Sequence, residues 1–127
     1  MKFSMLFLIV VSVGLAASAQ IALKSGMTDR KIAQLLSNKD YFAVPISVAA
    51  SPLILFGLFL FAVSFAIWLA VLASVPLSIA YPFVSLGICL TAVAGSVLFN
   101  ESFTIYKALG VALIVSGIFC ISLSGFE

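Results

Sequence analysis

Residues 51–100 read "SPLILFGLFLFAVSFAIWLAVLASVPLSIAYPFVSLGICLTAVAGSVLFN", a stretch without a single charged side chain. An apolar helix needs about 20 residues to cross a bilayer, so this stretch is long enough for two crossings. The chain must turn once between them, and "ASVPLS" (Ala73–Ser78) is the segment that suits a turn. Pro76 fits the first turn of a new helix, where its missing N–H costs nothing.

Two more uncharged blocks, residues 3–23 and 108–126, flank this stretch and have room for one crossing each. Of the 127 residues, 65% are hydrophobic and only 8% are charged, whereas soluble domains usually carry about 25% charged residues. The chain therefore has too little polar surface for a water-soluble globule. We predict a single all-α domain, an integral membrane bundle of four helices at about 3–24, 51–73, 77–99 and 104–124.

The end of the first block, "LAASAQ" (Leu15–Gln20), has a small-x-small pattern typical of a signal-peptidase site. A cleaved secretory signal is therefore the alternative to a first transmembrane helix. The uncharged run of 21 residues is longer than the 7–15 apolar residues of a typical signal core. We expect the segment to remain as the first crossing.

Half of the charged residues lie in the segment 25–50, between the first two crossings. Thr28 could cap a short helix there, and Ile32, Leu35 and Leu36 would form its apolar stripe. We expect a short interfacial helix at this place, with aromatic side chains at headgroup level. A solvated loop with one helical turn is the alternative.

Little in the chain supports catalysis. It has no histidine, and its two cysteines, Cys89 and Cys120, lie in predicted crossings. Serines are frequent, but no histidine or intramembrane carboxylate is present to activate one. We expect no enzyme activity, no metal or other cofactor and no nucleic-acid partner. The cysteines are expected to pack as small apolar side chains, and a disulfide between them is the less favoured alternative.

Polar side chains recur on one face of several predicted helices. Small and polar residues could serve close helix packing or could line a substrate path. We favour packing for Ser12, Ser64 and Ser96 and weigh the two roles equally for Gln20 and Tyr81. The stripes are Ser12, Ala16, Gln20 and Lys24 in the first crossing, Ser64 and Trp68 in the second, and Ser78, Tyr81, Ser85, Cys89, Ala92 and Ser96 in the third.

Two further features concern the shape of the last two crossings. Pro82 frees the carbonyl of Ser78 and is expected to bend the third helix beside Tyr81. In the fourth crossing, Gly110 and Gly117 are seven residues apart and present a smooth face to another helix. We predict that a partner subunit binds along this face.

Several motifs resemble a known family. "LASVPLSIAYPFVSLG" (Leu72–Gly87) and "LGVALIVSG" (Leu109–Gly117) are similar to the small multidrug resistance branch of the drug/metabolite transporter superfamily. The resemblance implies four helices and dimers paired through the fourth. Drug exporters of that branch carry a glutamate in the middle of the first helix, at or near Ala16 here. The absence of that acid argues against proton-coupled cation export.

A subfamily is closer. "LAASAQIALK" (Leu15–Lys24) and "VPLSIAYPFVSL" (Val75–Leu86) resemble the small subunits of the bacterial flippase for undecaprenyl-phosphate-linked aminoarabinose. This resemblance implies a carrier, or a subunit of one, for polyprenyl-phosphate-linked sugars in the bacterial inner membrane. Two alternatives remain: a small-molecule exporter without the usual acid, and a non-transporting accessory subunit that binds through the fourth helix.

A lipid phosphate calls for basic groups near the interface, and its tail can stay in the bilayer. We expect Lys24, helped by Arg30 or Lys31, to meet the phosphate first. Gln20 and Tyr81 would mark the two ends of a groove. Ser85, Trp68 and the small residues would line that groove, and Lys24 could alternatively serve only to anchor its helix.

The remaining expectations concern the loops. Glu101 is expected to have a structural role, either in capping or in a contact with Lys107. The predicted loops after the first and third helices contain five basic residues, and the opposite side contains only Lys2. This bias predicts one fixed orientation, with those loops in the cytosol and both termini outside.

Overall fold

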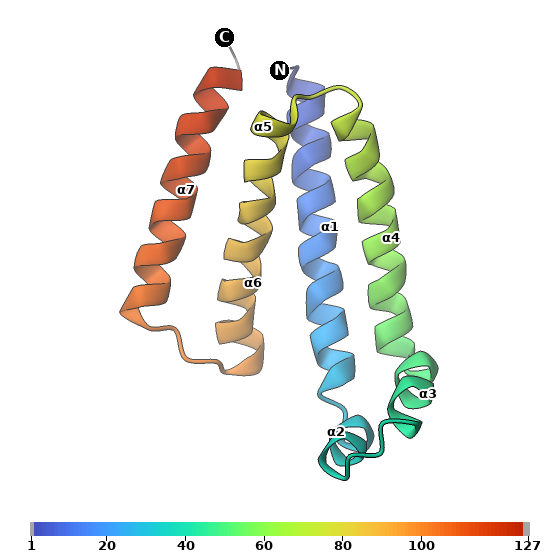
Figure 1. Ribbon diagram of the computed structural model, residues 1–127. Helices are drawn as coiled ribbons and strands as arrows, with labels where there is room; N and C mark the ends of the chain where they lie inside the picture. Colours follow the sequence, from blue (N-terminus) through green and yellow to red (C-terminus); the bar gives the residue numbers. More distant parts are fainter. Residues whose placement is uncertain (1, 126–127) are drawn as a thin grey trace.

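The computed structural model describes residues 2–125 and has four helical stretches that are long and apolar enough to cross a membrane (Figure 1). This confirms the predicted all-α membrane fold. The crossings are α1 (Phe3–Met27), α4 (Pro52–Leu72), the stretch Leu77–Phe99 and α7 (Ile105–Gly125). The first helix continues three residues beyond the predicted end at Lys24, so the basic side chain lies inside the helix.

The crossings lie in a row, in the order α7, α6 (Val84–Phe99), α1, α4 across the view of Figure 1. The helices α1 and α4 share the most extensive contact, α6 packs on the other side of α1, and α7 packs on α6. Both described ends of the chain and the turn after α4 lie at one end of the bundle, called here the terminal end. The opposite end, called the loop end, has the segment after α1 and the turn before α7.

The outer faces of the helices are apolar and exposed. Phe59 and Phe65 on α4 and Leu113 on α7 belong to a large set of exposed apolar side chains. In water such a surface would be unfavourable, but hydrocarbon solvates it as well as a protein interior does. The exposed side chains therefore mark the surface that faces lipid.

The buried apolar cluster lies toward the terminal end. Its residues come from the first half of α1, from the end of α4 and the turn after it, from the start of the third crossing, and from α7. Its buried members are Ile9, Val13, Val71, Val75, Ala80, Phe83 and Ile118. All four crossings therefore converge near the terminal end.

Close packing and paired serines join α1 to α4. The Ser64 hydroxyl donates to the carbonyl oxygen of Ser12 at 2.7 Å, and the Ser12 hydroxyl donates to the carbonyl oxygen of Ser64 at 2.9 Å. A Cβ atom on Gly57 would lie 2.9 Å from Leu23 Cγ, so only glycine allows this approach. The packing role predicted for Ser12 and Ser64 is confirmed.

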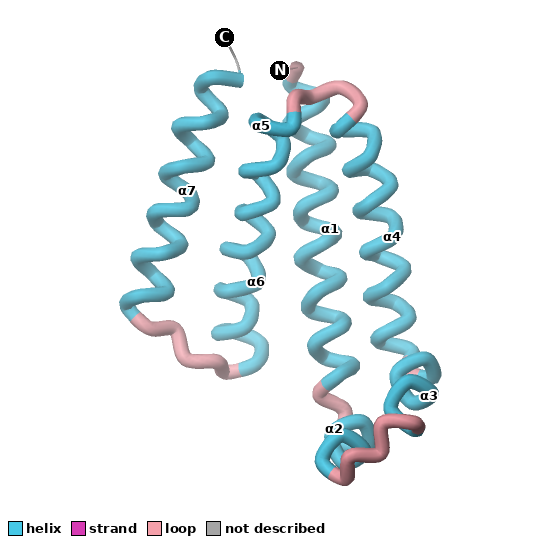
Figure 2. Tube along the Cα trace, in the orientation of Figure 1, coloured by secondary structure: helices cyan, strands magenta, loops and turns pink. Residues whose placement is uncertain are grey.

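The segment between α1 and α4 forms two short helices, α2 (Arg30–Ser37) and α3 (Ala43–Ala50), where one was predicted (Figure 2). The cap of α2 was also assigned wrongly. Asp29, not Thr28, is the N-cap, and its carboxylate accepts the N–H of Lys31 at 2.9 Å. The Thr28 hydroxyl instead donates to the carbonyl of Ser25, because Thr28 is the C-cap of α1.

The predicted stripe of α2 is only partly buried, since Ile32 is buried whereas Leu36 is exposed.

The third crossing is interrupted at its start. It consists of α5 (Leu77–Ala80), the 3₁₀ turn η1 (Tyr81–Phe83) and α6 (Val84–Phe99). Pro82 lies within η1, so the predicted irregularity is present as a change of helix type. Pro76 is the N-cap residue of α5 and directly precedes the helix. Cys89 is buried and Cys120 is exposed, and both thiols are free, which excludes the disulfide alternative.

Candidate functional site

A cleft of about 700 Å³ opens between α4 and α6, with α1 as its floor. Apolar and small side chains form most of its wall, and polar side chains occur at several levels along it. The polar and aromatic side chains that line it are Ser12, Gln20, Lys24, Phe61, Ser64, Phe65, Trp68, Tyr81, Thr91, Phe99 and Glu101. Several wall residues, including Phe65, Tyr81 and Ile88, are more than half exposed, so the wall is not closed off by the other helices of this chain. The cleft therefore communicates with the lipid-facing side of the bundle.

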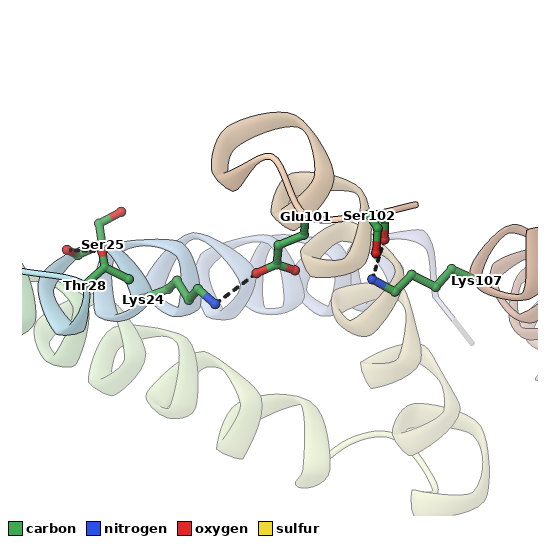
Figure 3. Close-up of polar contacts among 6 residues, drawn as sticks. All are labelled: Lys24, Ser25, Thr28, Glu101, Ser102 and Lys107. Carbon is green, nitrogen blue, oxygen red and sulfur yellow. Dashed lines mark hydrogen bonds and ion pairs between the residues drawn. The ribbon is translucent and has the colours of Figure 1, made fainter. Parts of the chain in front are cut away.

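An ion pair lies at the loop end of this cleft. Lys24 Nζ is 2.9 Å from Glu101 Oε1, and both side chains are about half exposed, at 50% and 41% (Figure 3). The same ammonium lies 5.7 Å from the centroid of the Phe99 ring, within range of a cation–π interaction. The pair joins α1 to the turn between α6 and α7, two segments far apart in the sequence.

The end of α6 places Glu101 in this position. Asn100 adopts the left-handed conformation with φ 52°, which asparagine tolerates better than most residues. The N–H groups of Asn100 and Glu101 both donate to the carbonyl of Gly95, which closes the helix. A Cβ atom on Gly95 would lie 2.6 Å from Glu101 Oε2. The missing side chain of Gly95 therefore leaves the space that the carboxylate occupies.

The predicted partner of Glu101 was wrong. Lys107 does not pair with it, and Lys107 Nζ donates to the carbonyl of Ser102 at 2.6 Å (Figure 3). The left-handed conformation of Asn100 directs the side chain of Glu101 back along α6 toward α1. The short separation of Glu101 and Lys107 in the sequence could not indicate this direction. The hydrogen bond and the charge of Lys24 lower the pKa of the Glu101 carboxyl, with a smaller contribution from Lys107.

The cleft contains only part of the predicted site. Gln20, Lys24, Trp68 and Tyr81 line it, as does Ala16. Gln20 and Lys24 are one turn apart on α1, and Trp68 and Tyr81 lie toward the terminal end on opposite walls.

The prediction for the third helix was wrong by one position. Ser85 and Cys89 do not line the cleft, whereas Val84, Ile88 and Thr91 do. A uniform α-helix places the residue four positions after Tyr81 on the same face. The 3₁₀ turn at Tyr81 has three residues per turn, which brings the residue three positions later onto that face.

The basic residues of α2 also lie outside the cleft wall, since neither Arg30 nor Lys31 lines it. Both are exposed at the loop end. Two contributors that the sequence reasoning missed are Gly95 and Asn100. The turn itself was predicted, between the helices at 77–99 and 104–124. An asparagine directly after an apolar helix is a known stop signal, and it could have identified the residue that closes α6.

The predicted subunit face on α7 is uncovered by the rest of the described chain. A Cβ atom added to Gly110 or to Gly117 would meet no atom within 4 Å. The two glycines are therefore not needed for packing among the helices of this chain.

The sequence model of the EamA-like transporter family matches residues 2–123. The chain belongs to this family. The match covers all four crossings, so the cleft and the ion pair lie within the family domain of this EamA-like protein. No solved structure matches it.

Curated relatives make the resemblance more specific. The ArnF protein of Pseudomonas fluorescens (strain Pf0-1) is 35% identical over 114 residues, which cover 87% of this chain and 81% of the relative. The ArnF protein of Erwinia tasmaniensis is 36% identical over 116 residues, with 87% of each chain covered. A shorter match to ArnE of Serratia proteamaculans is 46% identical over 59 residues, 46% of this chain and 51% of the relative.

All three relatives are described as probable 4-amino-4-deoxy-L-arabinose-phosphoundecaprenol flippase subunits. The resemblance inferred from the sequence motifs is thereby confirmed. This EamA-like protein is similar to small flippase subunits over most of its length.

Proposed function

We propose that this EamA-like protein moves a polyprenyl-phosphate-linked sugar across the bacterial inner membrane, as a flippase or as one subunit of a flippase. The family and the relatives support a membrane carrier of this class. The observation on which the proposal chiefly rests is the cleft itself. It combines a basic group at one end with a largely apolar wall that is open to lipid.

The chemistry of such a lipid matches the two parts of the cleft. Its phosphate needs a cation and hydrogen-bond donors, whereas its polyprenyl tail needs only hydrocarbon. Lys24 supplies the cation at the loop end, and the Gln20 amide lies one turn deeper on the same helix face. Arg30 and Lys31 lie outside the wall, and in this proposal they attract the anion to the loop end without holding it.

The far part of the cleft provides a path for the headgroup. Ser12 and Ser64 lie near its middle, and Trp68 and Tyr81 border it toward the terminal end. The tail remains in the bilayer, so no acid or base is required deep in the membrane. The absence of the exporter glutamate near Ala16 is compatible with this cargo.

A second subunit completes the proposal. The relatives are described as flippase subunits, and Gly110 and Gly117 leave one face of α7 uncovered within this chain. Because its basic residues favour one orientation, an antiparallel partner would be a different chain with the opposite charge bias. A reporter fused after residue 127 should be active outside the cytosol, and activity in the cytosol would contradict the orientation.

Binding of a lipid phosphate tests the proposal. The full chain would be purified in a maltoside detergent, which contains no phosphate, and titrated with undecaprenyl phosphate. The fluorescence of Trp68 reports binding, because it is the only tryptophan of the chain and lines the cleft. Uncharged undecaprenol serves as the control ligand.

The decisive variant is Lys24→Gln, with Lys39→Gln as the matched control outside the cleft wall. A lost hydrogen bond to a charged group costs about 1.5–3 kcal/mol, which is about tenfold or more in affinity. We expect that loss for Lys24→Gln and no change for Lys39→Gln. Unchanged affinity of a well-folded Lys24→Gln protein would remove Lys24 from the mechanism.

A further inference from the structure

The ion pair has a consequence for binding that follows from its place in the cleft. Within residues 2–125, Lys24 and Glu101 are the charged residues that line the cleft, and they face each other. Each neutralises the other, so the empty cleft has a cation that already holds an anion. A phosphate that reaches Lys24 finds its ammonium already paired with the Glu101 carboxylate.

The backbone and the carboxylate of Glu101 are held very differently. Its backbone is anchored, because the Glu101 N–H donates to the Gly95 carbonyl at 3.2 Å. Its oxygens pair with Lys24 alone among the described residues, and the side chain is 41% exposed. The carboxylate can therefore leave Lys24 by a rotation of its own side chain, without any change in α6.

We propose that Glu101 occupies the phosphate position at Lys24 in the unloaded protein and is displaced when a lipid phosphate binds. The inference rests on the proposed function, because it takes Lys24 as the phosphate-binding group. Glu101 then acts as a competitor built into the site. It selects for ligands with an anion strong enough to replace a carboxylate, and an uncharged polyprenol cannot replace it.

Displacement of Glu101 also removes a contact between two segments at the loop end. The Lys24–Glu101 pair joins α1 to the turn before α7. When a phosphate takes Lys24, this link is broken, while the backbone cap at Gly95 stays in place. The headgroup thus enters the cleft at the place where the ion pair between α1 and the turn before α7 is broken.

The test compares the affinity for undecaprenyl phosphate of the wild-type chain and of Glu101→Gln, by Trp68 fluorescence in the same detergent. Glutamine keeps the size of the side chain and removes the competing charge. We expect binding to tighten by roughly twofold to fivefold, the factor that corresponds to a half-exposed ion pair. In the double variant with Lys24→Gln, removal of the Glu101 charge should give no gain.

Asp40→Asn is the matched control. Asp40 is an exposed acid at the loop end and does not line the cleft, and its Oδ1 accepts the N–H of Ala43, a role that asparagine can keep. If the gain came only from the removal of one negative charge from a protein whose formal net charge is +2, Asp40→Asn would show it as well. Equal tightening in both variants contradicts the inference, and tightening in Glu101→Gln alone supports it.

If Glu101→Gln does not fold, a second variant can test the competition between Glu101 and the phosphate. Gly95→Ala adds a Cβ where the carboxylate now lies, and only the end of a flexible side chain has to move. Alanine is favoured over glycine inside a helix, so the fold should tolerate it. Gly95→Ala should also tighten binding of undecaprenyl phosphate, and affinity no higher than wild type in a folded variant overturns the inference.

The outcomes separate this inference from the proposed function. If Lys24→Gln leaves binding unchanged, the proposed binding site fails and the competition fails with it. If Lys24→Gln weakens binding while Glu101→Gln does not strengthen it, the site stands and only the competition is wrong.

Discussion

The helices α4 and α6 both pack against α1, but the two contacts differ in extent and in kind. Toward α4, the contact runs along most of the helix and includes reciprocal serine hydrogen bonds and a glycine against Leu23. Toward α6, the contact is smaller, with Gly87 close to Val13 and the Lys24–Glu101 pair at the loop end. The cleft occupies the space that α6 leaves open.

This difference shows how a small membrane protein can be rigid on one side and receptive on the other. Helices in lipid gain little from burying apolar surface against each other, so they associate through close approach and hydrogen bonds. The α1–α4 pair has both, with close approach at Gly57 and hydrogen bonds between Ser12 and Ser64. The α1–α6 pair has a polar contact that water or a ligand at the interface can replace.

The largest effect is expected where α1 and α4 approach most closely. Gly57→Leu would force a side chain into Leu23 and the carbonyl of Ala19. Overpacking of this kind costs about 3 kcal/mol at the upper end of its usual range. Gly117→Leu is the control, since nothing lies near Gly117, and it should change stability by less than about 0.5 kcal/mol. Unfolding in mixed micelles measures both, and equal losses would contradict the rigid α1–α4 contact.

The next effect concerns the turn that carries Glu101. Asn100→Val places a β-branched residue at φ 52°, and the left-handed conformation costs about 1–2 kcal/mol for ordinary residues. Asn100→Gly should be nearly neutral, because glycine adopts this conformation freely. Comparison of the two free energies of unfolding checks the prediction. If valine is as well tolerated as glycine, the cap does not position Glu101 as described.

A smaller effect is expected for the serine pair. Ser12→Ala and Ser64→Ala each remove a hydroxyl from the hydrogen bonds between α1 and α4. Such bonds between membrane helices average about 0.6 kcal/mol. The control is Ser116→Ala, whose hydroxyl donates only to Ala112 of its own helix. A double-mutant cycle should show coupling between Ser12 and Ser64, and additive losses would argue against a shared contact.

The smallest effect is a pH dependence on the α6 side. Lys24 lowers the pKa of Glu101 in the folded chain, so the folded state favours the charged carboxylate. Its stabilising contribution is present above the pKa of the unfolded chain and is lost as pH falls through the folded pKa. Stability measured across the acidic range should therefore decline less in Lys24→Gln than in wild type. An identical decline in both proteins would mean that the pair does not form in solution.

The membrane fold followed from the sequence, because charge placement is a strong constraint in a bilayer. The uncharged blocks around "ASVPLS" determined how many helices cross and where the chain turns. The basic side chain of Lys24 and the amide of Gln20 were likewise recognisable as a pair one turn apart. These features depend on spacing along a regular helix, which sequence alone specifies.

The tertiary structure decided how the helices pair and which side chains meet. The 3₁₀ turn at Pro82 shifted the cleft face from Ser85 to Val84, and a local change of helix type cannot be read from spacing that assumes a uniform helix. The contact between Lys24 and Glu101 joins residues far apart in the chain. It depends on the left-handed turn at Asn100 and on the empty space over Gly95, because only a folded backbone can aim one side chain at another across a cleft.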